Sequence, residues 1–156
     1  MHIPDKISKW IRAKNWTLHE HQIRMFKSSE CSSQLLIAPT GSGKTLAGFL
    51  PTIADLYLNP SQKLHTLYIS PLKALASDIK RNLETPIKEL ELKISVEDRT
   101  GDTKQSIKKK QRVIPPNILL TTPESLALLM SYPEAPSIFS SLKRIIVDEI
   151  HAITES

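Results

Sequence analysis

Short apolar runs alternate with longer amphipathic segments along the chain. The apolar runs predict five strands, most of which lack the polar–apolar alternation of a strand with one solvated face. Such runs are typical of parallel strands that helices cover on both faces, so the pattern favours an α/β fold built from βαβ units. The predicted strands are Gln34–Ala38, Thr66–Ser70, Ile94–Glu97, Asn117–Thr121 and Arg144–Asp148.

Helical spacing of apolar residues predicts helices between these strands. Two stripes run through Leu46–Tyr57 and Leu72–Leu83, and a third helix starts at Thr122-Pro123-Glu124. Pro51 is expected to kink the first of these helices, because proline lacks a backbone donor. Before the first strand, residues 5–28 predict either one helix or two helices broken near Asn15.

The overall composition is that of one globular domain. The chain has 156 residues, of which 40% are hydrophobic and 24% are charged, which argues against a disordered protein. A single cysteine, Cys31, excludes an intrachain disulfide framework and a cysteine-built zinc site. There is no apolar run of transmembrane length, and the first residues lack the apolar core of a signal peptide. We therefore expect a soluble, cytoplasmic protein.

Positive charge is concentrated in the middle of the chain. The net charge is +5, and residues 61–112 hold 12 basic and 7 acidic side chains, whereas residues 113–156 hold 2 and 5. The densest basic stretch runs from Lys104 to Arg112. This distribution indicates either a polyanionic partner or a solvated, lysine-rich helix face, and charge alone does not separate the two.

The strongest chemical motif is the segment Ala38-Pro39-Thr40-Gly41-Ser42-Gly43-Lys44-Thr45. It matches the phosphate-binding pattern G-x-x-x-x-G-K-[ST], with alanine in place of the first glycine, and lies between a predicted strand and a predicted helix. Gly41 and Gly43 allow the backbone to turn its N–H groups toward phosphate. Lys44 is expected to reach the β and γ phosphates and Thr45 to offer a hydroxyl to Mg²⁺. The alternative is a chance Gly-Lys-Thr turn.

A second motif is Ile145-Ile146-Val147-Asp148-Glu149, three apolar residues followed by two acids. A buried parallel strand would deliver both carboxylates to its carboxyl end, where ligands of open α/β sheets bind. Asp148 would then hold Mg²⁺, and Glu149 would orient and deprotonate the attacking water. On its own, such a run also fits a strand that simply exits into solvent.

With these motifs in place, Asp148-Glu149-Ile150-His151 reads as a D-E-x-H box, and the set resembles superfamily 2 helicases. It is most similar to the first motor domain of the bacterial ligase-associated DExH-box helicases, relatives of the large helicase-related proteins. The residues that carry the resemblance are His21-Gln22, LLIAPTGSGKTLAGFLP (35–51), LHTLYISPLKALASDIKRNLETP (64–86), RTGDT (99–103), PPNILLTTPESLALL (115–129) and IIVDEIHA (145–152).

The resemblance implies a RecA-like P-loop NTPase domain with a mainly parallel sheet and helices on both faces. Residues 1–30 would form an N-terminal helical region, and residues 31–156 an incomplete first ATP-binding domain. The implied activity is that of an ATP-dependent DNA helicase or translocase acting in DNA repair, with ATP and Mg²⁺ as cofactors. Implied partners are single-stranded DNA, or DNA with a single-stranded tail, and the ligase and nuclease of the same repair system.

The same resemblance assigns roles to single residues. Gln22 would read the adenine, and His151 would couple the nucleotide site to a second motor domain. The implied phosphate-binding residues are Thr40, Gly41, Ser42, Gly43, Lys44 and Thr45; Thr45 and Asp148 would bind Mg²⁺, and Lys44, Asp148 and Glu149 would be catalytic. The implied DNA-binding residues are Pro71, Lys73, Arg99, Thr100, Gly101, Thr122, Pro123 and Glu124.

The family pattern continues beyond the last residue printed here. Its S-A-T-type coupling motif, its second motor domain and the arginine finger of that domain are not among these 156 residues. In this type of sheet, the strand with the coupling motif lies between the phosphate-loop strand and the DExH strand. We therefore expect either two unpaired inner strand edges or a rearranged sheet, and marginal stability or aggregation of the isolated polypeptide.

Three other interpretations compete with a motor. The chain could be an isolated non-catalytic fragment or gene remnant with at most weak nucleotide and nucleic-acid binding. It could belong to another P-loop class, such as a small kinase or a transport ATPase, although no acceptor-site signature is present. It could also be a passive basic DNA-binding module, which would leave the glycines and Lys44 of the phosphate loop unexplained.

Overall fold

The computed structural model describes residues 3–28, 33–37 and 43–150. The chain divides into two compact units, Met1–Pro60 and Ser61–Ser156. Each unit is built around its own elements.

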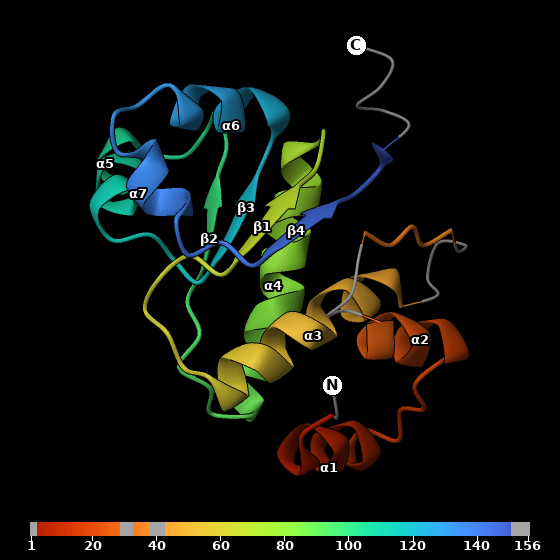
Figure 1. The fold of residues 1–156 in the computed structure, drawn as a ribbon. Coiled ribbons are helices and arrows are strands. Elements are labelled where there is room, and N and C mark those ends of the chain that lie inside the picture. Colours follow the sequence, from red (N-terminus) through yellow and green to blue (C-terminus); the bar gives the residue numbers. More distant parts are fainter. Residues whose placement is uncertain (1–2, 29–32, 38–42, 151–156) are drawn as a thin grey trace. The chain divides into compact units, whose positions relative to one another are not determined.

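The described part of the first unit contains the helices α1 (Asp5–Ala13), α2 (Glu20–Ser28) and α3 (Lys44–Leu58), of which α2 packs against α3 (Figure 1). Asn15 has a φ of 55°, in the left-handed region that asparagine tolerates better than most residues. This residue ends the first helical segment, so the two-helix alternative is confirmed. Pro51 lies inside α3 and is buried there.

The predicted strand Gln34–Ala38 is not formed over residues 34–37, and Ala38 lies outside the described residues. The side chains of Leu35 and Ile37 are 73% and 87% exposed. A strand exists only where a neighbouring strand accepts its backbone hydrogen bonds, and no described strand pairs with this segment. Apolar sequence alone therefore gave a wrong prediction here, because it carries no information about the pairing partner.

The second unit is built on a parallel sheet with the strand order β2-β3-β1-β4 (Figure 1). The strands are β1 (Thr66–Ile69), β2 (Val96–Arg99), β3 (Ile118–Thr121) and β4 (Arg144–Val147). Each pairs in parallel with its neighbour, which confirms the predicted α/β class. Three of the four strands start within one residue of their predicted positions, and β2 lies two residues further along the chain than expected.

Helices α4 (Lys73–Glu89), α5 (Gln105–Val113), α6 (Pro123–Met130) and α7 (Ala135–Phe139) accompany this sheet. Helix α4 contacts β2 and β3. A separate apolar core joins α6 and α7 to the sheet through Leu64, Leu67, Leu119, Leu129 and Ile138. The apolar patterning predicted α4 and α6. Helix α5 covers most of the basic stretch for which a lysine-rich helix face was one alternative, and α7 was not predicted. Within the described ranges, no helix is long and apolar enough to cross a membrane.

Asn117 connects the amino ends of three strands from a buried position. Its Oδ1 accepts a hydrogen bond from Ser95 N at 3.0 Å, ahead of β2. Its Nδ2 donates to Ser61 O at 2.7 Å and to Lys63 O at 3.1 Å, ahead of β1. Since Asn117 itself immediately precedes β3, this one amide fixes how the three strands start relative to one another.

Strand β4 lies at one edge of the sheet and pairs, among the described strands, with β1 alone. Ile145 and Val147 of β4 are 57% and 41% exposed. An edge strand with exposed apolar side chains is a template for pairing with another chain. This edge agrees with the expectation of an unpaired strand edge beside the DExH box.

We predict that the 156-residue polypeptide, expressed alone, self-associates and unfolds in a broad thermal transition. A lysine on the exposed edge should oppose pairing between edges, so Val147→Lys is expected to shift the polypeptide toward monomer in sedimentation velocity. Val113→Lys is the matched control, because Val113 is 78% exposed but lies on a helix. A cooperative transition of the unmodified chain above the mesophile range of about 45–65 °C would contradict this expectation.

Candidate nucleotide and nucleic-acid site

Four of the sequence motifs meet at one edge of the sheet, because the strands that carry them are parallel. The paired residues at the ends of these strands are Ile69, Arg99, Thr121 and Val147. The residues that follow them are Ser70, Thr100, Thr122 and Asp148. In parallel α/β sheets this carboxyl edge is the place where ligands bind. The register therefore brings residues that are far apart in the sequence onto one functional surface.

Asp148 is held at this edge by its backbone and by both carboxylate oxygens. Its N–H donates to Ile69 O at 2.9 Å, which extends the ladder between β4 and β1 by one bond. Its Oδ2 accepts from the hydroxyl of Tyr68 at 2.8 Å, and its Oδ1 accepts from Glu149 N at 2.9 Å. The carboxylate that the sequence assigned to Mg²⁺ is thus fixed in orientation.

Glu149, the predicted catalytic base, has a φ of 50°. A left-handed conformation is uncommon for glutamate and costs of the order of 1 kcal/mol or more. The backbone therefore turns sharply just after β4, and the N–H of Glu149 points back at Asp148. His151, the predicted coupling residue, lies outside the described residues.

Tyr68 lies near this edge, and the sequence patterns did not single it out as functional. Its side chain is only 2% exposed. Burial, followed by the hydrogen bond to Asp148, raises the pKa of Tyr68 far above its usual value, so the hydroxyl stays a proton donor at neutral pH. Strand alternation places Tyr68 and Ser70 on one face, but the partner of that face lies about 80 residues away. No local signal identifies such a pair.

The described part of the phosphate loop begins at Gly43, because residues 38–42 lie outside the described residues. The predicted phosphate ligands Thr40, Gly41 and Ser42 are therefore not placed. Gly43 has a φ of 75° and is the N-cap of α3, while Lys44 and Thr45 form the first turn of this helix. The start of the helix at this point confirms the predicted loop-to-helix junction, whose free N–H groups and dipole favour an anion.

Gln22 of α2 contacts the end of this loop. Its Nε2 donates to Gly43 O at 3.1 Å, and its Oε1 accepts from His19 N at 2.7 Å. The side chain is buried at 3% exposure. A β-carbon added at Gly43 would come within 2.4 Å of Gln22 Nε2, so this amide would have to move, and the φ of 75° by itself favours glycine at position 43. Gln22, the predicted adenine-reading residue, is thus hydrogen-bonded to the last residue before α3.

The carboxylate of Asp148 is an oxygen donor of the kind that Mg²⁺ prefers, and Mg²⁺ is usually bound through one or two carboxylates plus substrate phosphates. The hydroxyl of Thr45, which belongs to the other unit, is also an oxygen donor. Each oxygen of Asp148 accepts one hydrogen bond and has a second acceptor position. No group of three or more His, Cys, Asp or Glu side chains in the described part of the chain could form a protein-only metal cage. Each of these oxygen donors, taken by itself, fits an ion that arrives with a nucleotide.

The segment between β1 and α4 ends in an open helix N-terminus. Helix α4 begins after Leu72 with no side-chain cap, and Leu72 is 58% exposed. Lys73 in the first turn forms an ion pair with Asp102 at 3.0 Å. Lys108 Nζ also donates to Gly101 O at 3.4 Å, so two lysines converge on the turn after β2. This arrangement of free amides and cations suits phosphate oxygens.

Arg99, predicted to contact the DNA backbone, has its side chain turned into the protein and is 2% exposed. Its guanidinium donates to Lys108 O at 3.0 Å and to Gln111 Oε1 at 3.2 Å. Burial lowers the pKa of Arg99. The side chain fastens α5 to β2, because its polar partners all lie on that helix. In this structure it is not available to a phosphate, so the exposed part of the motif is the turn that follows.

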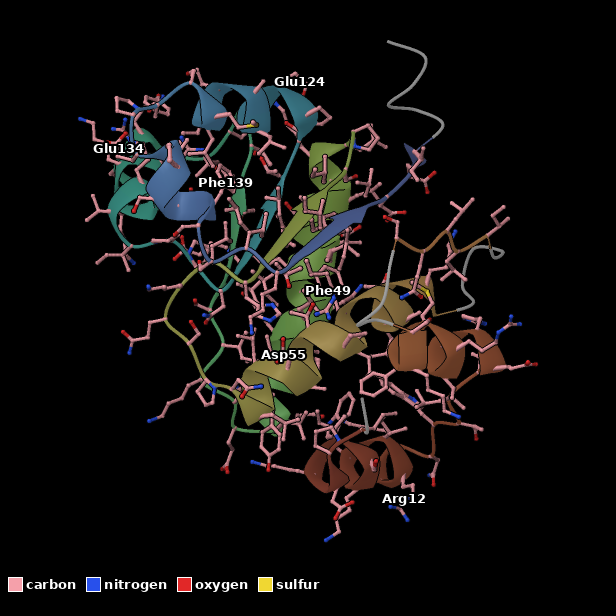
Figure 2. The ribbon with its side chains drawn as sticks, viewed as in Figure 1. Arg12, Phe49, Asp55, Glu124, Glu134 and Phe139 are labelled. Atoms are coloured by element: carbon pink, nitrogen blue, oxygen red, sulfur yellow. The ribbon has the colours of Figure 1, made fainter. Side chains whose placement is uncertain are left out.

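The remaining predicted DNA contacts divide into buried and exposed groups. Thr100 and Thr122 are both buried, and each uses its hydroxyl within its own turn. Thr100 Oγ1 accepts from Asp102 N at 3.3 Å, and Thr122 Oγ1 accepts from Ser125 N at 3.4 Å as the N-cap of α6. Gly101 is exposed, and so is Glu124 at the start of α6 (Figure 2). Pro71 and Pro123 are half-buried.

Parallel βαβ connections, with motif residues gathered at the carboxyl edge, define a nucleotide-binding domain of the RecA-like P-loop class. A model of the DEAD/DEAH box helicase family matches residues 19–156. The chain therefore belongs to the DEAD/DEAH box helicase family.

Its relatives are helicases of the Lhr type. "ATP-dependent helicase Lhr-Core protein 2" of Thermococcus barophilus is 37% identical over 99% of this chain and 20% of its own length. "Lhr helicase/ probable uracil glycosylase" of Mycolicibacterium smegmatis is 44% identical over 80% of this chain and 9% of its own length. The chain thus spans about a fifth or less of the length of these curated relatives.

Solved structures agree with this assignment. Mycobacterium smegmatis helicase Lhr bound to ssDNA and AMP-PNP matches with a TM-score of 0.87 and 38% identity, over 97% of this chain and 21% of that one. The DUF1998 helicase MrfA bound to DNA and AMPPNP matches with a TM-score of 0.86 and 32% identity, over 96% of this chain and 21% of that one. These matches confirm the predicted superfamily and the predicted RecA-like fold.

We predict that Gly43 and Gln22 are energetically coupled. Gly43→Ala should lower the thermal midpoint, because the added methyl group meets the Gln22 amide and the φ is unfavourable for alanine. Gln22→Ala should also lower it, through the loss of two hydrogen bonds. In the double variant the methyl group no longer meets the amide, so the loss should be smaller than the sum by about 0.5–3 kcal/mol. Strict additivity in this double-mutant cycle would show that the contact is absent.

Proposed function

We propose that these residues form the ATP-binding front part of the first motor domain of a DNA helicase that translocates on single-stranded DNA. The observation that carries the proposal is the alignment of Ser70, Thr100, Thr122 and Asp148 at the carboxyl edge of one parallel sheet. Further support comes from relatives named ATP-dependent helicases and from an Lhr structure described as bound to ssDNA and AMP-PNP.

In this proposal the phosphate loop and the DExH box supply the chemistry of ATP hydrolysis. Lys44 would contact the β and γ phosphates together with the amides of the loop, from Thr40 to Thr45, and Gln22 would read the adenine. Glu149 would orient and deprotonate the attacking water. Thr45 and Asp148 would hold Mg²⁺, which supplies neutralisation of the phosphate charge when bound.

The turns at the carboxyl edge would bind the DNA backbone without reading its sequence. The first-turn amides of α4 and the ammonium group of Lys73 would contact one phosphate, with Pro71 shaping the approach. The exposed amide of Gly101 would contact another phosphate, in a turn shaped by Thr100. The start of α6, from Thr122 through Pro123 to Glu124, would contact a third. Arg99 contributes by fixing α5 and the turn rather than by touching DNA.

The wider setting is also part of the proposal. Residues 1–30 would be an accessory helical region, residues 31–156 the start of the ATP-binding domain, and His151 the link to a second motor domain. A cytoplasmic DNA-repair role beside a ligase and a nuclease follows from the resemblance to the ligase-associated subgroup. The 156-residue polypeptide alone would turn over no ATP, because the family's arginine finger lies in the second motor domain.

Lys44→Ala in the full-length protein should abolish DNA-stimulated ATP hydrolysis, with a fall in kcat of at least about 100-fold. The reason is the loss of the ammonium group that, in this proposal, contacts the transferred phosphate. Lys9→Ala is the matched control, because Lys9 is an exposed residue of α1 outside the loop. Steady-state phosphate release measures both variants, and activity retained by Lys44→Ala would refute the loop assignment.

Lys73→Ala should weaken binding of single-stranded DNA and make it less dependent on salt. Loss of one phosphate contact is expected to reduce the slope of log affinity against log salt by about 0.7. Lys88→Ala is the control, because Lys88 is an exposed lysine in the last turn of the same helix, α4. Fluorescence anisotropy with labelled oligonucleotides at several salt concentrations measures the slope. Equal slopes for the two variants would exclude Lys73 from the interface.

A further inference from the structure

We propose that Tyr68 is a positioning residue for Mg²⁺·nucleotide binding: its hydroxyl fixes the carboxylate of Asp148 in the orientation that receives the ion. This inference rests on the proposed function, since it assumes that Asp148 binds nucleotide-borne Mg²⁺. It adds a residue outside the phosphate loop and the DExH box.

The contact is a product of the sheet register. Tyr68 of β1 stands opposite Ile146 of β4. Side chains two residues apart on a strand share a face, so Asp148 lies on the same face as Ile146 and one step closer to the carboxyl edge. A tyrosine is long enough to reach that position, and its hydroxyl donates to Asp148 Oδ2 at 2.8 Å. A one-residue slip of β4 would remove the contact.

The two hydrogen bonds to Asp148 act together on the carboxylate plane. Tyr68 holds Oδ2 and the backbone N–H of Glu149 holds Oδ1. With one donor on each oxygen, rotation about the last side-chain bond breaks one contact or the other. The acceptor positions that remain then point in a fixed direction. Partners of this kind orient a metal-binding side chain and raise the affinity of the site.

The donor itself is rigid. The Tyr68 side chain is 2% exposed and is surrounded by protein, so its ring has little freedom to follow a carboxylate that moves. A flexible or solvated donor would stabilise Asp148 without selecting one orientation. The buried ring of Tyr68 on the central strand β1 therefore holds the Asp148 carboxylate, at the end of the edge strand β4, in one position.

The test is the Mg²⁺ dependence of nucleotide binding by the full-length protein and its Tyr68→Phe variant. Affinity for a fluorescent, non-hydrolysable ATP analogue is measured with Mg²⁺ titrated in and again with a chelator present. We expect Tyr68→Phe to raise the Mg²⁺ concentration at half-maximal binding about tenfold, the lower end of the effect of such partners. The affinity without metal should stay unchanged.

Tyr132→Phe is the matched control, because Tyr132 is a half-buried tyrosine of the same unit whose ring, not its hydroxyl, contacts Arg112. It should behave like the unmodified protein, and Asp148→Asn should lose the Mg²⁺ dependence. A Tyr68→Phe variant with unchanged Mg²⁺ dependence overturns the inference alone. A variant that also loses metal-free affinity overturns it in favour of a general structural role. An unmodified protein without Mg²⁺-dependent binding overturns the proposed function as well.

Discussion

The parallel register of the sheet is the constraint on which the candidate site depends. Strand β1 pairs with β3 on one side and with β4 on the other, and each pairing brings strand ends level. Asn117 sets the opposite ends of β1, β2 and β3 through its buried amide. Because the strands are only four residues long, an error of one residue at the amino ends would appear undiminished at the carboxyl edge. The positions of the site residues at the carboxyl edge therefore depend on the hydrogen bonds of Asn117 at the amino ends of the strands.

At the carboxyl edge, most polar side chains are already occupied by the protein. Thr100 and Thr122 close their own turns, and Asp148 accepts two hydrogen bonds. Groups satisfied in this way hold the loops still, which leaves backbone amides and a few lysines to meet an incoming phosphate. A surface built from fixed amides contacts a sugar–phosphate chain without distinguishing one base from another. This would suit the proposed motor, which must bind every position along a DNA strand with the same affinity.

The sequence predicted what is local and missed what depends on pairing. Hydrophobic runs located all four strands of the sheet, and the Gly-Lys-Thr turn located the start of α3, since these signals lie within a few residues. The run at residues 34–37 failed because a strand also needs a partner. The contact between Tyr68 and Asp148 could not be predicted for a related reason, because only the register brings together residues 80 positions apart.

Several basic side chains in the middle of the chain are buried or paired, so the count of basic residues overstates the positive charge exposed to solvent. Arg99 is buried with neutral oxygens of α5 as its partners, so its charge acts inside the protein. Lys110 lies 4.0 Å from Glu97, and the guanidinium of Arg112 stacks on a tyrosine ring. Burying or pairing a cation reduces the potential that it projects into solvent. Lys73 at the start of α4 is paired as well, with Asp102 at 3.0 Å. The length of the basic run therefore overstates the attraction that this part of the chain could exert on a polyanion.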